Sequence, residues 1–204
     1  MKDHPYIVAI SGASGSIYGV RLIKALVELD RQVLVILSNS GLEVLSHEMG
    51  YKKIDGKTEA FKEFLVSCGV QMRSQDQLEV FYEDQMASAS ASGSFIHCGM
   101  VVVPCSMKTL SAISSGFADT LLTRSADVCL KERRPLILVP RETPYNLIHL
   151  ENMTRAHLAG AVILAPSPSF YGFPKTIEDL VDTVVARILD HLKISHDLLP
   201  RWSS

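Results

Sequence analysis

The sequence has no large net charge and no long apolar run, and both absences narrow what the protein can be. The 204 residues carry a formal net charge of −2, so there is no basic field of the kind that attracts nucleic acid. No apolar run approaches the roughly 18 residues that a membrane-spanning helix needs. A strand-like run begins already at Tyr6, and no charged-then-apolar signal pattern precedes it. We therefore expect a cytoplasmic protein.

Cysteine is scarce and is not arranged for metal binding. The four cysteines, Cys68, Cys98, Cys105 and Cys129, form no CxxC pair and no Cys/His group with zinc spacing. We expect reduced and mostly buried thiols, because free cysteine is among the most buried residue types. Cys105 follows an apolar strand and borders a candidate site, but no base is placed in the sequence to activate it. No bound metal is expected.

Short apolar runs alternate with helical patterns along the whole chain. Strands are expected at 6–10, 33–37, 78–82, 100–103, 136–139 and 161–164. Helices are expected at 16–29, 41–48, 59–68, 107–115, 121–133, 147–158 and 177–192. This alternation predicts an α/β protein with a doubly wound, mostly parallel sheet of the Rossmann-like or flavodoxin-like kind. No composition shift marks a second domain, so we expect residues 1–204 to form a single domain.

Two segments stand outside this alternation. The small-residue run 85–93, QMASASASG, is either a flexible surface loop or a wall where small side chains let a flat ligand approach the backbone. The C-terminal tail, 193–204, contains the only tryptophan, Trp202, in an apolar stretch. We expect the tail to pack on a neighbouring subunit.

The first expected strand ends in a turn of small residues that leads into a helix. The turn, 11–16, presents backbone N–H groups and a helix N-terminus to an anion, and its glycines allow close approach. The glycine spacing is not GxGxxG, and Ser38 stands where a dinucleotide site would have an acidic residue. These features disfavour NAD and favour another phosphate-bearing ligand. The structural alternative is that Ser14 or Ser16 caps the helix.

A second turn of the same kind follows the strand at 100–103. Residues 104–109, Pro-Cys-Ser-Met-Lys-Thr, again place small polar residues between a strand and the start of a helix. Two adjacent strand ends with such turns form one mononucleotide crevice. The residues by themselves therefore predict an α/β mononucleotide-binding protein.

The run 131–144, KERRPLILVPRETP, carries charge at both ends of a buried strand. Arg141 and Glu142 follow its carboxyl end, where ligands bind in open α/β sheets. Lys131 and Arg134 precede its other end, roughly 17 Å away at about 3.3 Å per residue. One pocket cannot easily use both ends of the same strand, but two subunits contributing to one site would bring both charged groups together.

Together these segments resemble the UbiX-type flavin prenyltransferases, a group of homo-oligomeric flavin-binding α/β proteins. The matching stretches are residues 11–22, 104–116, 123–144, 149–153, 167–171 and 200–202. The long block at 123–144 is the most specific of them. The sequence departs from the family at 165–168, where a Pro-Pro pair is common, and the segment 50–85 matches poorly.

The resemblance implies a reaction. The prenyl group of dimethylallyl monophosphate joins N5 and C6 of reduced FMN, and the prenylated FMN serves as the cofactor of a partner decarboxylase. It also implies a homo-oligomer, in the family a dodecamer, with active sites between subunits. The sequence leaves open the phosphate count of the donor, the pathway and the identity of the partner decarboxylase.

The family motifs also imply residue roles, position by position. The expected FMN-binding residues are Gly12, Ala13, Ser14, Ser38, Ser106, Met107, Lys108, Thr109 and Arg141. The expected donor-phosphate residues are Arg124, Lys131, Tyr171 and Arg187. The expected catalytic residues are Ser14, near flavin N5, and the carboxylates Glu48 and Glu142. A carboxylate that protonates a phosphate near neutral pH needs a raised pKa, which a partly closed apolar pocket is expected to supply.

Structural alternatives stand beside these roles. Lys131 would stabilise a helix C-terminus, Glu48 would be a solvated surface acid, and Arg187 would extend past the apolar stripe of the last helix. Tyr171 would only pack, and Glu142 would pair with the neighbouring arginine.

Two other functions also stay open. One is a flavin-dependent decarboxylase acting on a cysteine-derived carboxylate, and the other is a non-enzymatic FMN carrier. The four donor-phosphate residues favour the prenyltransferase over the decarboxylase. A carrier has no use for Glu142 or for a second anion site.

Overall fold

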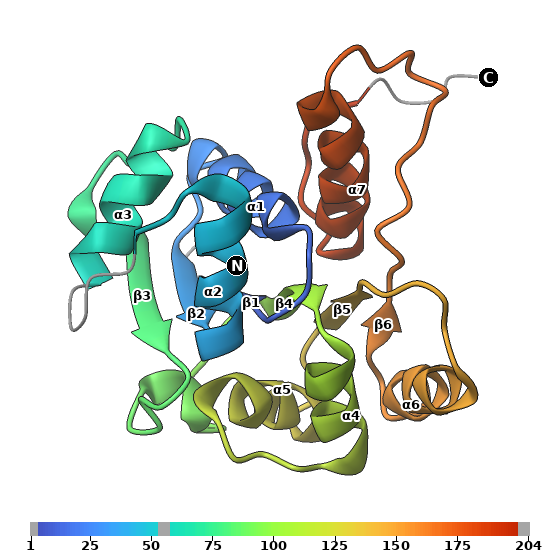
Figure 1. The fold of residues 1–204 in the computed structure, drawn as a ribbon. Coiled ribbons are helices and arrows are strands. Elements are labelled where there is room, and N and C mark those ends of the chain that lie inside the picture. The colour runs from blue at the N-terminus through green and yellow to red at the C-terminus, as the bar shows by residue number, and fades with distance from the viewer. Residues whose placement is uncertain (1–3, 53–57, 200–204) are drawn as a thin grey trace.

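The computed structural model describes residues 4–52 and 58–199 and shows an α/β fold with one sheet between two layers of helices (Figure 1). The strands are β1 (Tyr6–Ile10), β2 (Val33–Leu37), β3 (Leu78–Tyr82), β4 (Gly99–Cys105), β5 (Leu136–Pro140) and β6 (Val162–Ile163). The helices are α1 (Ser16–Glu28), α2 (Asn39–Met49), α3 (Thr58–Ser67), α4 (Met107–Ser115), α5 (Leu121–Lys131), α6 (Leu147–Leu158) and α7 (Ile177–His191). Two short 3-10 helices lie at Gln75–Gln77 and Ala89–Ala91.

All six strands are parallel, in the order β3-β2-β1-β4-β5-β6. This is the Rossmann strand order, which reverses direction between β1 and β4. The predicted doubly wound sheet is therefore confirmed. The reversal also sets β1 beside β4, so that the two turns of small residues follow neighbouring strand ends.

Alternate residues of β1 face opposite layers, as the two-residue period of a strand requires. Tyr6, Val8 and Ile10 pack with α1, α2, α3 and α7, whereas Ile7 and Ala9 pack with α4, α5 and α6. All five residues are buried, which explains why the strand reads as a continuous apolar run. The two helix layers are visible on either side of the sheet in Figure 1.

The last helix shows how sequence signals set an element and its contacts. The Thr176 side chain accepts from the N–H of Asp179 in a capping box that begins α7. Val184 and Ile188 are buried on its inner face. The Arg21 guanidinium forms a two-pronged ion pair with Asp182, which ties α7 to α1.

The segment 85–93 is not a free loop. Its central residue, Ser90, is only 1% exposed and packs in the 3-10 helix at Ala89–Ala91 against α5. Neither the flexible-loop nor the flat-ligand interpretation anticipated this contact.

The described part of the C-terminal tail packs on its own chain. Ile194 is buried, and Leu198 contacts the core cluster that includes α7. Trp202 and the rest of 200–204 lie outside the described residues, so the predicted contact with a neighbouring subunit stays a prediction. Among the helices that the structure describes, none is long and apolar enough to cross a membrane.

Candidate active site

The two predicted turns are joined by one buried serine. The Ser11 hydroxyl donates to the Pro104 carbonyl at 2.9 Å and accepts from the N–H of Ser106 at 2.8 Å. The N–H of Ser11 also donates to the Pro104 carbonyl at 3.2 Å. Ser11 is fully buried, so these bonds lock the ends of β1 and β4 into one unit at the switch point of the sheet.

A cavity of about 610 Å³ opens at this point, within the range of small-molecule and cofactor sites. Seven of the predicted site residues line it: Gly12, Ser38, Ser106, Met107, Lys108, Thr109 and Glu142. Residues that the sequence did not assign also line it: Ser40, Glu83, Ser111, Ala112, Ser115, Phe117, Asp119, Thr120, Leu122 and Thr123. Most of the side chains that line the cavity are thus small or polar, which suits a flat, polar ligand.

Glycine is required where the first turn meets the start of α2. A Cβ atom on Gly12 would lie 2.4 Å from the Cβ atom of Ser40, which no packing arrangement accommodates. Gly15 has φ of 101°, in the left-handed region that favours glycine. The glycines of the motif therefore serve close approach and turn geometry.

The N-terminus of α4 is suited to an anion. Ser106 caps the helix by accepting from the N–H of Thr109 at 3.2 Å. The next two N–H groups, on Met107 and Lys108, belong to the helix positions that have no intrahelical acceptor, and both residues line the cavity. These N–H groups, the helix dipole and the lysine ammonium together favour a phosphate here.

The N-terminus of α1 is organised differently, and the structural alternative, a cap by Ser14 or Ser16, is wrong. Gly15 is the N-cap residue, and because glycine has no side chain, it cannot cap the helix itself. Instead the Glu48 carboxylate accepts from the N–H of Gly15, at 3.0 and 3.1 Å, and from the N–H of Ser16 at 2.9 Å. A carboxylate of α2 thus holds the helix end where the sequence predicted a ligand anion.

The structural alternative for Glu48, a solvated surface acid, is therefore wrong, because its carboxylate accepts three backbone hydrogen bonds. Partial burial raises its pKa, but hydrogen bonds from the Ser14 hydroxyl and from the N–H groups of Ser16 and Gly15 outweigh this effect. The pKa lies below its ordinary value, so Glu48 is ionised at neutral pH. The raised pKa that a general acid requires is not found at this carboxylate.

Arg141 and Glu142 follow the carboxyl end of β5, as predicted. The N–H of Arg141 donates to the Cys105 carbonyl at 3.1 Å, which fixes the backbone beside the second turn. Burial raises the pKa of the Tyr18 phenol, and the Arg141 guanidinium lowers it in part, which places the guanidinium near α1. The Glu142 carboxylate accepts from the N–H of Thr143 at 2.9 Å and forms part of the cavity rim.

The four predicted donor-phosphate residues lie elsewhere. Among the described residues that line the cavity, none is Arg124, Lys131, Tyr171 or Arg187. Three of the four pair with carboxylates of their own helix or its end: Arg124 with Asp127 at 2.5 Å, Lys131 with Glu132, and Arg187 with Asp190 at 2.8 Å. Tyr171 is 83% exposed.

Lys131 and Glu142 lie beyond opposite ends of β5. Lys131 lines a separate depression with Arg133 and Arg134, near the amino ends of the strands, whereas Glu142 lines the cavity at their carboxyl ends. The distance argument from the sequence is consistent with this placement. One chain does not bring Lys131 into the cavity that contains Glu142.

The cysteines have no sign of reactivity. Burial raises the pKa of Cys105 and of Cys129 to about 12, so both are neutral thiols. Cys68 and Cys98 are half-buried. In residues 4–52 and 58–199 no three His, Cys, Asp or Glu side chains are grouped to hold a metal ion.

Two functional features were missed from the sequence. Ser11 bridges the two turns, and the Glu83 carboxylate accepts from the N–H of Asn39 at 2.9 Å beside the cavity. Ser11 and Ser106 are 95 positions apart, so only the placement of a serine directly after an apolar strand hinted at such a role. Glu83 gave no signal beyond its position after β3.

A crevice at the switch point of a Rossmann-type sheet, with an anion-binding helix end on one wall, defines a mononucleotide-binding α/β protein. The Flavoprotein family description matches residues 1–189 of the chain. Flavin prenyltransferase UbiX of Pseudomonas aeruginosa is 46% identical over 196 residues, which are 96% of this chain and 92% of that protein.

Two solved structures are similar along nearly the whole chain. A UbiX protein crystallised in complex with FMN and dimethylallyl pyrophosphate has a TM-score of 0.84 and 39% identity over 98% of each chain. A dodecameric FMN-dependent UbiX-like decarboxylase from Escherichia coli O157:H7 has a TM-score of 0.84 and 36% identity, over 98% of this chain and 100% of that one. The chain belongs to the Flavoprotein family and, within it, to the UbiX flavin prenyltransferases.

Proposed function

We propose that this protein transfers the dimethylallyl group of dimethylallyl monophosphate to N5 and C6 of reduced FMN. The observation that carries the proposal is the cavity at the switch point, with an anion-binding helix end on one wall and the Glu142 carboxylate at its rim, in a chain of this family. The product is prenylated FMN, and a decarboxylase that depends on this cofactor is its recipient.

The cavity fits FMN. The N-terminus of α4, with Ser106, Met107, Lys108 and Thr109, offers N–H groups and an ammonium to the phosphate. Gly12 lines the cavity and lets the first turn lie against Ser40, where a Cβ atom would collide. The remaining flavin-side residues proposed from the family are Ala13, Ser14, Ser38 and Arg141. FMN, when bound in its reduced form, supplies the nucleophilic ring atoms of the reaction.

Two side chains are proposed to act on protons. The C–O bond of the donor breaks as the bond to N5 forms, N5 loses its proton, and the departing phosphate takes a proton from Glu142. The C=C bond of the transferred group then opens: one carbon takes a proton while the other bonds to C6, which loses its own proton. Glu142 is suited to protonate the phosphate because it lies on the rim, within reach of a second ligand above the flavin. Glu48 is ionised and holds the turn that contains Ser14, so its proposed role is to orient the Ser14 hydroxyl and accept a proton.

The donor phosphate is proposed to bind to residues of two subunits. Arg124 and Lys131 lie outside the cavity of their own chain, so a neighbouring subunit would bring them to it. Tyr171 and Arg187 are the other two proposed phosphate ligands. Charge that builds on the leaving phosphate is stabilised by such cations. The two-subunit site requires a homo-oligomer, and a dodecamer is the proposed assembly.

Exposed apolar side chains support association. Leu147, Ile148 and Leu158 of α6 are 70%, 64% and 80% exposed, and Phe170 and Phe173 of the following segment are 70% and 86% exposed. Apolar surface of this kind marks a contact site in soluble proteins. Phe170 and Phe173 flank Tyr171 in the sequence, so part of this apolar surface borders one of the proposed donor-phosphate residues.

The test is anaerobic incubation of the protein with reduced FMN and dimethylallyl monophosphate. Mass spectrometry is expected to show FMN that has gained one five-carbon unit, with release of inorganic phosphate. Unchanged flavin mass in the presence of tightly bound FMN would instead indicate a carrier. Release of carbon dioxide from a peptide with a C-terminal cysteine would indicate a decarboxylase.

A further inference from the structure

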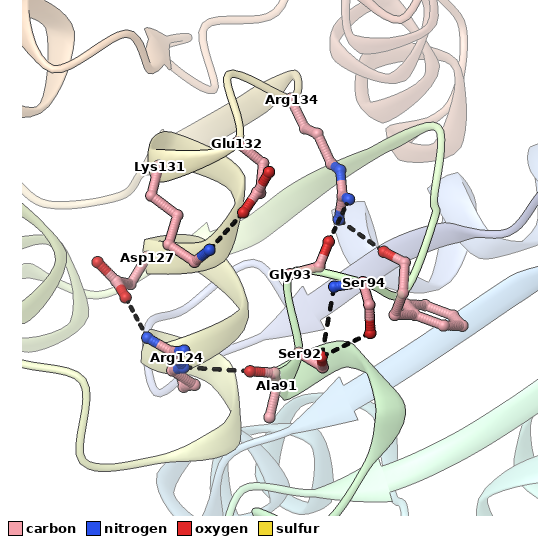
Figure 2. A network of polar contacts seen from close by, with 10 residues as sticks. Ala91, Ser92, Gly93, Ser94, Arg124, Asp127, Lys131, Glu132 and Arg134 are labelled. Carbon is pink, nitrogen blue, oxygen red and sulfur yellow. Dashed lines mark hydrogen bonds and ion pairs between the residues drawn. The ribbon is translucent and has the colours of Figure 1, made fainter.

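The segment that joins β3 to β4 runs the length of α5. Because both strands are parallel, this connection must return from the carboxyl edge of the sheet to its amino edge. Residues 85–95, here called the strap, make this return along α5, as Figure 2 shows for Ala91 to Ser94. The strap therefore passes the cations of α5 and Arg134, which follows the helix.

Backbone carbonyls of the strap accept from two of these cations. The Ala91 carbonyl accepts from Nε of Arg124 at 3.1 Å. The Gly93 and Phe95 carbonyls accept from the two terminal nitrogens of Arg134, at 2.7 and 2.6 Å. Figure 2 shows both guanidinium groups turned towards the strap. These bonds restrict long side chains that would otherwise sample many rotamers.

A buried hydroxyl pair anchors the strap to the helix. The Ser125 hydroxyl of α5 and the Ser90 hydroxyl of the strap lie 3.1 Å apart, and the two residues are 0% and 1% exposed. Two buried hydroxyl groups hold a defined geometry, because a hydroxyl that moved away would lose its hydrogen-bond partner and find no water to replace it. The strap is thereby held at a fixed distance from α5.

Gly93 is the point where the strap meets Lys131. A Cβ atom on Gly93 would lie 2.7 Å from Nζ of Lys131 and 2.6 Å from Oε1 of Glu132. Gly93 does not have a left-handed φ angle, so its backbone accepts an L-residue. The absence of a side chain at 93 therefore serves the lysine ammonium rather than the backbone.

We propose that the strap is a positioning element for the donor-phosphate cations and that Gly93 is the residue that sets the position of the Lys131 ammonium. This inference rests on the proposed function and assigns the small-residue run a role in it. Small side chains allow the strap to lie close to α5, and its carbonyls direct the guanidinium of Arg124. Cations fixed before the donor arrives lose less freedom on binding its phosphate.

Gly93→Ala isolates this role. The added methyl group meets only the ends of two flexible side chains, so the fold is retained while the ammonium moves. Loss of one charge-assisted hydrogen bond predicts about a tenfold rise in KM for dimethylallyl monophosphate. The same loss weakens donor binding to the protein–FMN complex in calorimetry. The affinity for FMN stays unchanged, because the strap lies outside the flavin cavity.

Ser94→Ala is the matched control. Ser94 is in the same strap and is exposed, and the hydrogen-bond partner of its hydroxyl among the described residues is Ser92, at 2.9 Å. The KM of Ser94→Ala is therefore expected to stay within about twofold of the wild-type value. Equal KM values for Gly93→Ala and wild type would overturn the strap inference, and so would an equal loss of FMN affinity.

The two proposals fail in different ways. A wild-type protein that binds dimethylallyl monophosphate without prenylating FMN contradicts the proposed function, while calorimetry with Gly93→Ala still decides on the strap. Normal wild-type turnover with an unaffected Gly93→Ala variant contradicts the strap alone. A wild-type protein–FMN complex that does not bind the donor contradicts both.

Discussion

The flavin side and the donor-phosphate side of the proposed site are built in contrasting ways. On the flavin side, Ser11 joins two buried turns, and Glu48 holds the start of α1. On the donor-phosphate side, Lys131 and Arg187 are exposed and pair with carboxylates of their own segments. One chain thus forms a cavity lined by six of the nine expected FMN-binding residues, without Ala13, Ser14 and Arg141, and leaves the expected donor-phosphate residues outside it.

This contrast indicates that the flavin side depends on a rigid pocket within one chain, whereas the donor-phosphate side depends on the association of subunits. Buried hydrogen bonds specify the geometry of the proposed flavin pocket within one chain. In the proposed two-subunit site, Arg124 and Lys131 reach the donor phosphate only when another subunit is present, so the donor side would depend on association. The strap partly compensates by fixing Arg124 and, through Gly93, Lys131 on their own subunit.

The largest effect is expected from Glu142→Gln, which keeps the shape of the rim but removes its proton. The kcat for prenylation should fall by about 10²- to 10⁴-fold, the usual contribution of a general acid, with FMN affinity unchanged. Stopped-flow measurement of flavin absorbance checks this, with Glu151→Gln on exposed α6 as the control. Unchanged turnover would contradict the proton-transfer role of Glu142 without affecting the proposal that the cavity binds FMN.

Ser11→Ala tests whether the flavin side is preassembled. The change leaves the N–H of Ser106 without its acceptor and should lower the free energy of unfolding by about 1–3 kcal/mol. FMN affinity should fall with it, since the second turn loses its tie to the first. Urea denaturation and flavin titration measure both effects, with Ser46→Ala on exposed α2 as the control. Full retention of both quantities would show that the turns hold their geometry independently.

The smallest effect is expected from Glu48→Gln and depends on pH. The folded-state pKa of Glu48 lies below its ordinary value of 4.5, so the carboxylate stabilises the fold above that pH. The contribution is lost as pH falls through the folded-state pKa. Wild type should therefore exceed Glu48→Gln in stability at pH 7 and lose this advantage below pH 4.5, as the pH falls through the folded-state pKa. Urea denaturation over a series of pH values measures it, with Glu43→Gln of the same helix expected to show no such trend.

Local sequence signals were sufficient for the fold. Continuous apolar runs marked β1, β2 and β5 to within one residue, because buried parallel strands are apolar on both faces. The last strand was placed at 161–164 and is shorter, at Val162–Ile163. Seven of the site residues named from the family motifs line one cavity in the structure.

Contacts between distant segments could not be predicted in this way. The Glu48 bond to Gly15 spans 33 positions, and the Ser125–Ser90 pair spans 35. Nothing local in the sequence distinguishes these side chains from solvated ones. For the same reason the sequence of 85–93 predicts only a loop or a ligand wall, whereas Ser90 of this run contacts α5.

Subunit complementation tests most directly whether the site is shared between chains. Lys131→Ala and Glu142→Gln are each expected to be nearly inactive as separate proteins. In oligomers formed by coexpressing the two in equal amounts, about a quarter of the sites would combine an intact Lys131 with an intact Glu142 if these residues come from different subunits. The account predicts that prenylation of FMN returns to roughly that fraction of the wild-type rate. Activity no higher than that of the two separate variants would contradict it.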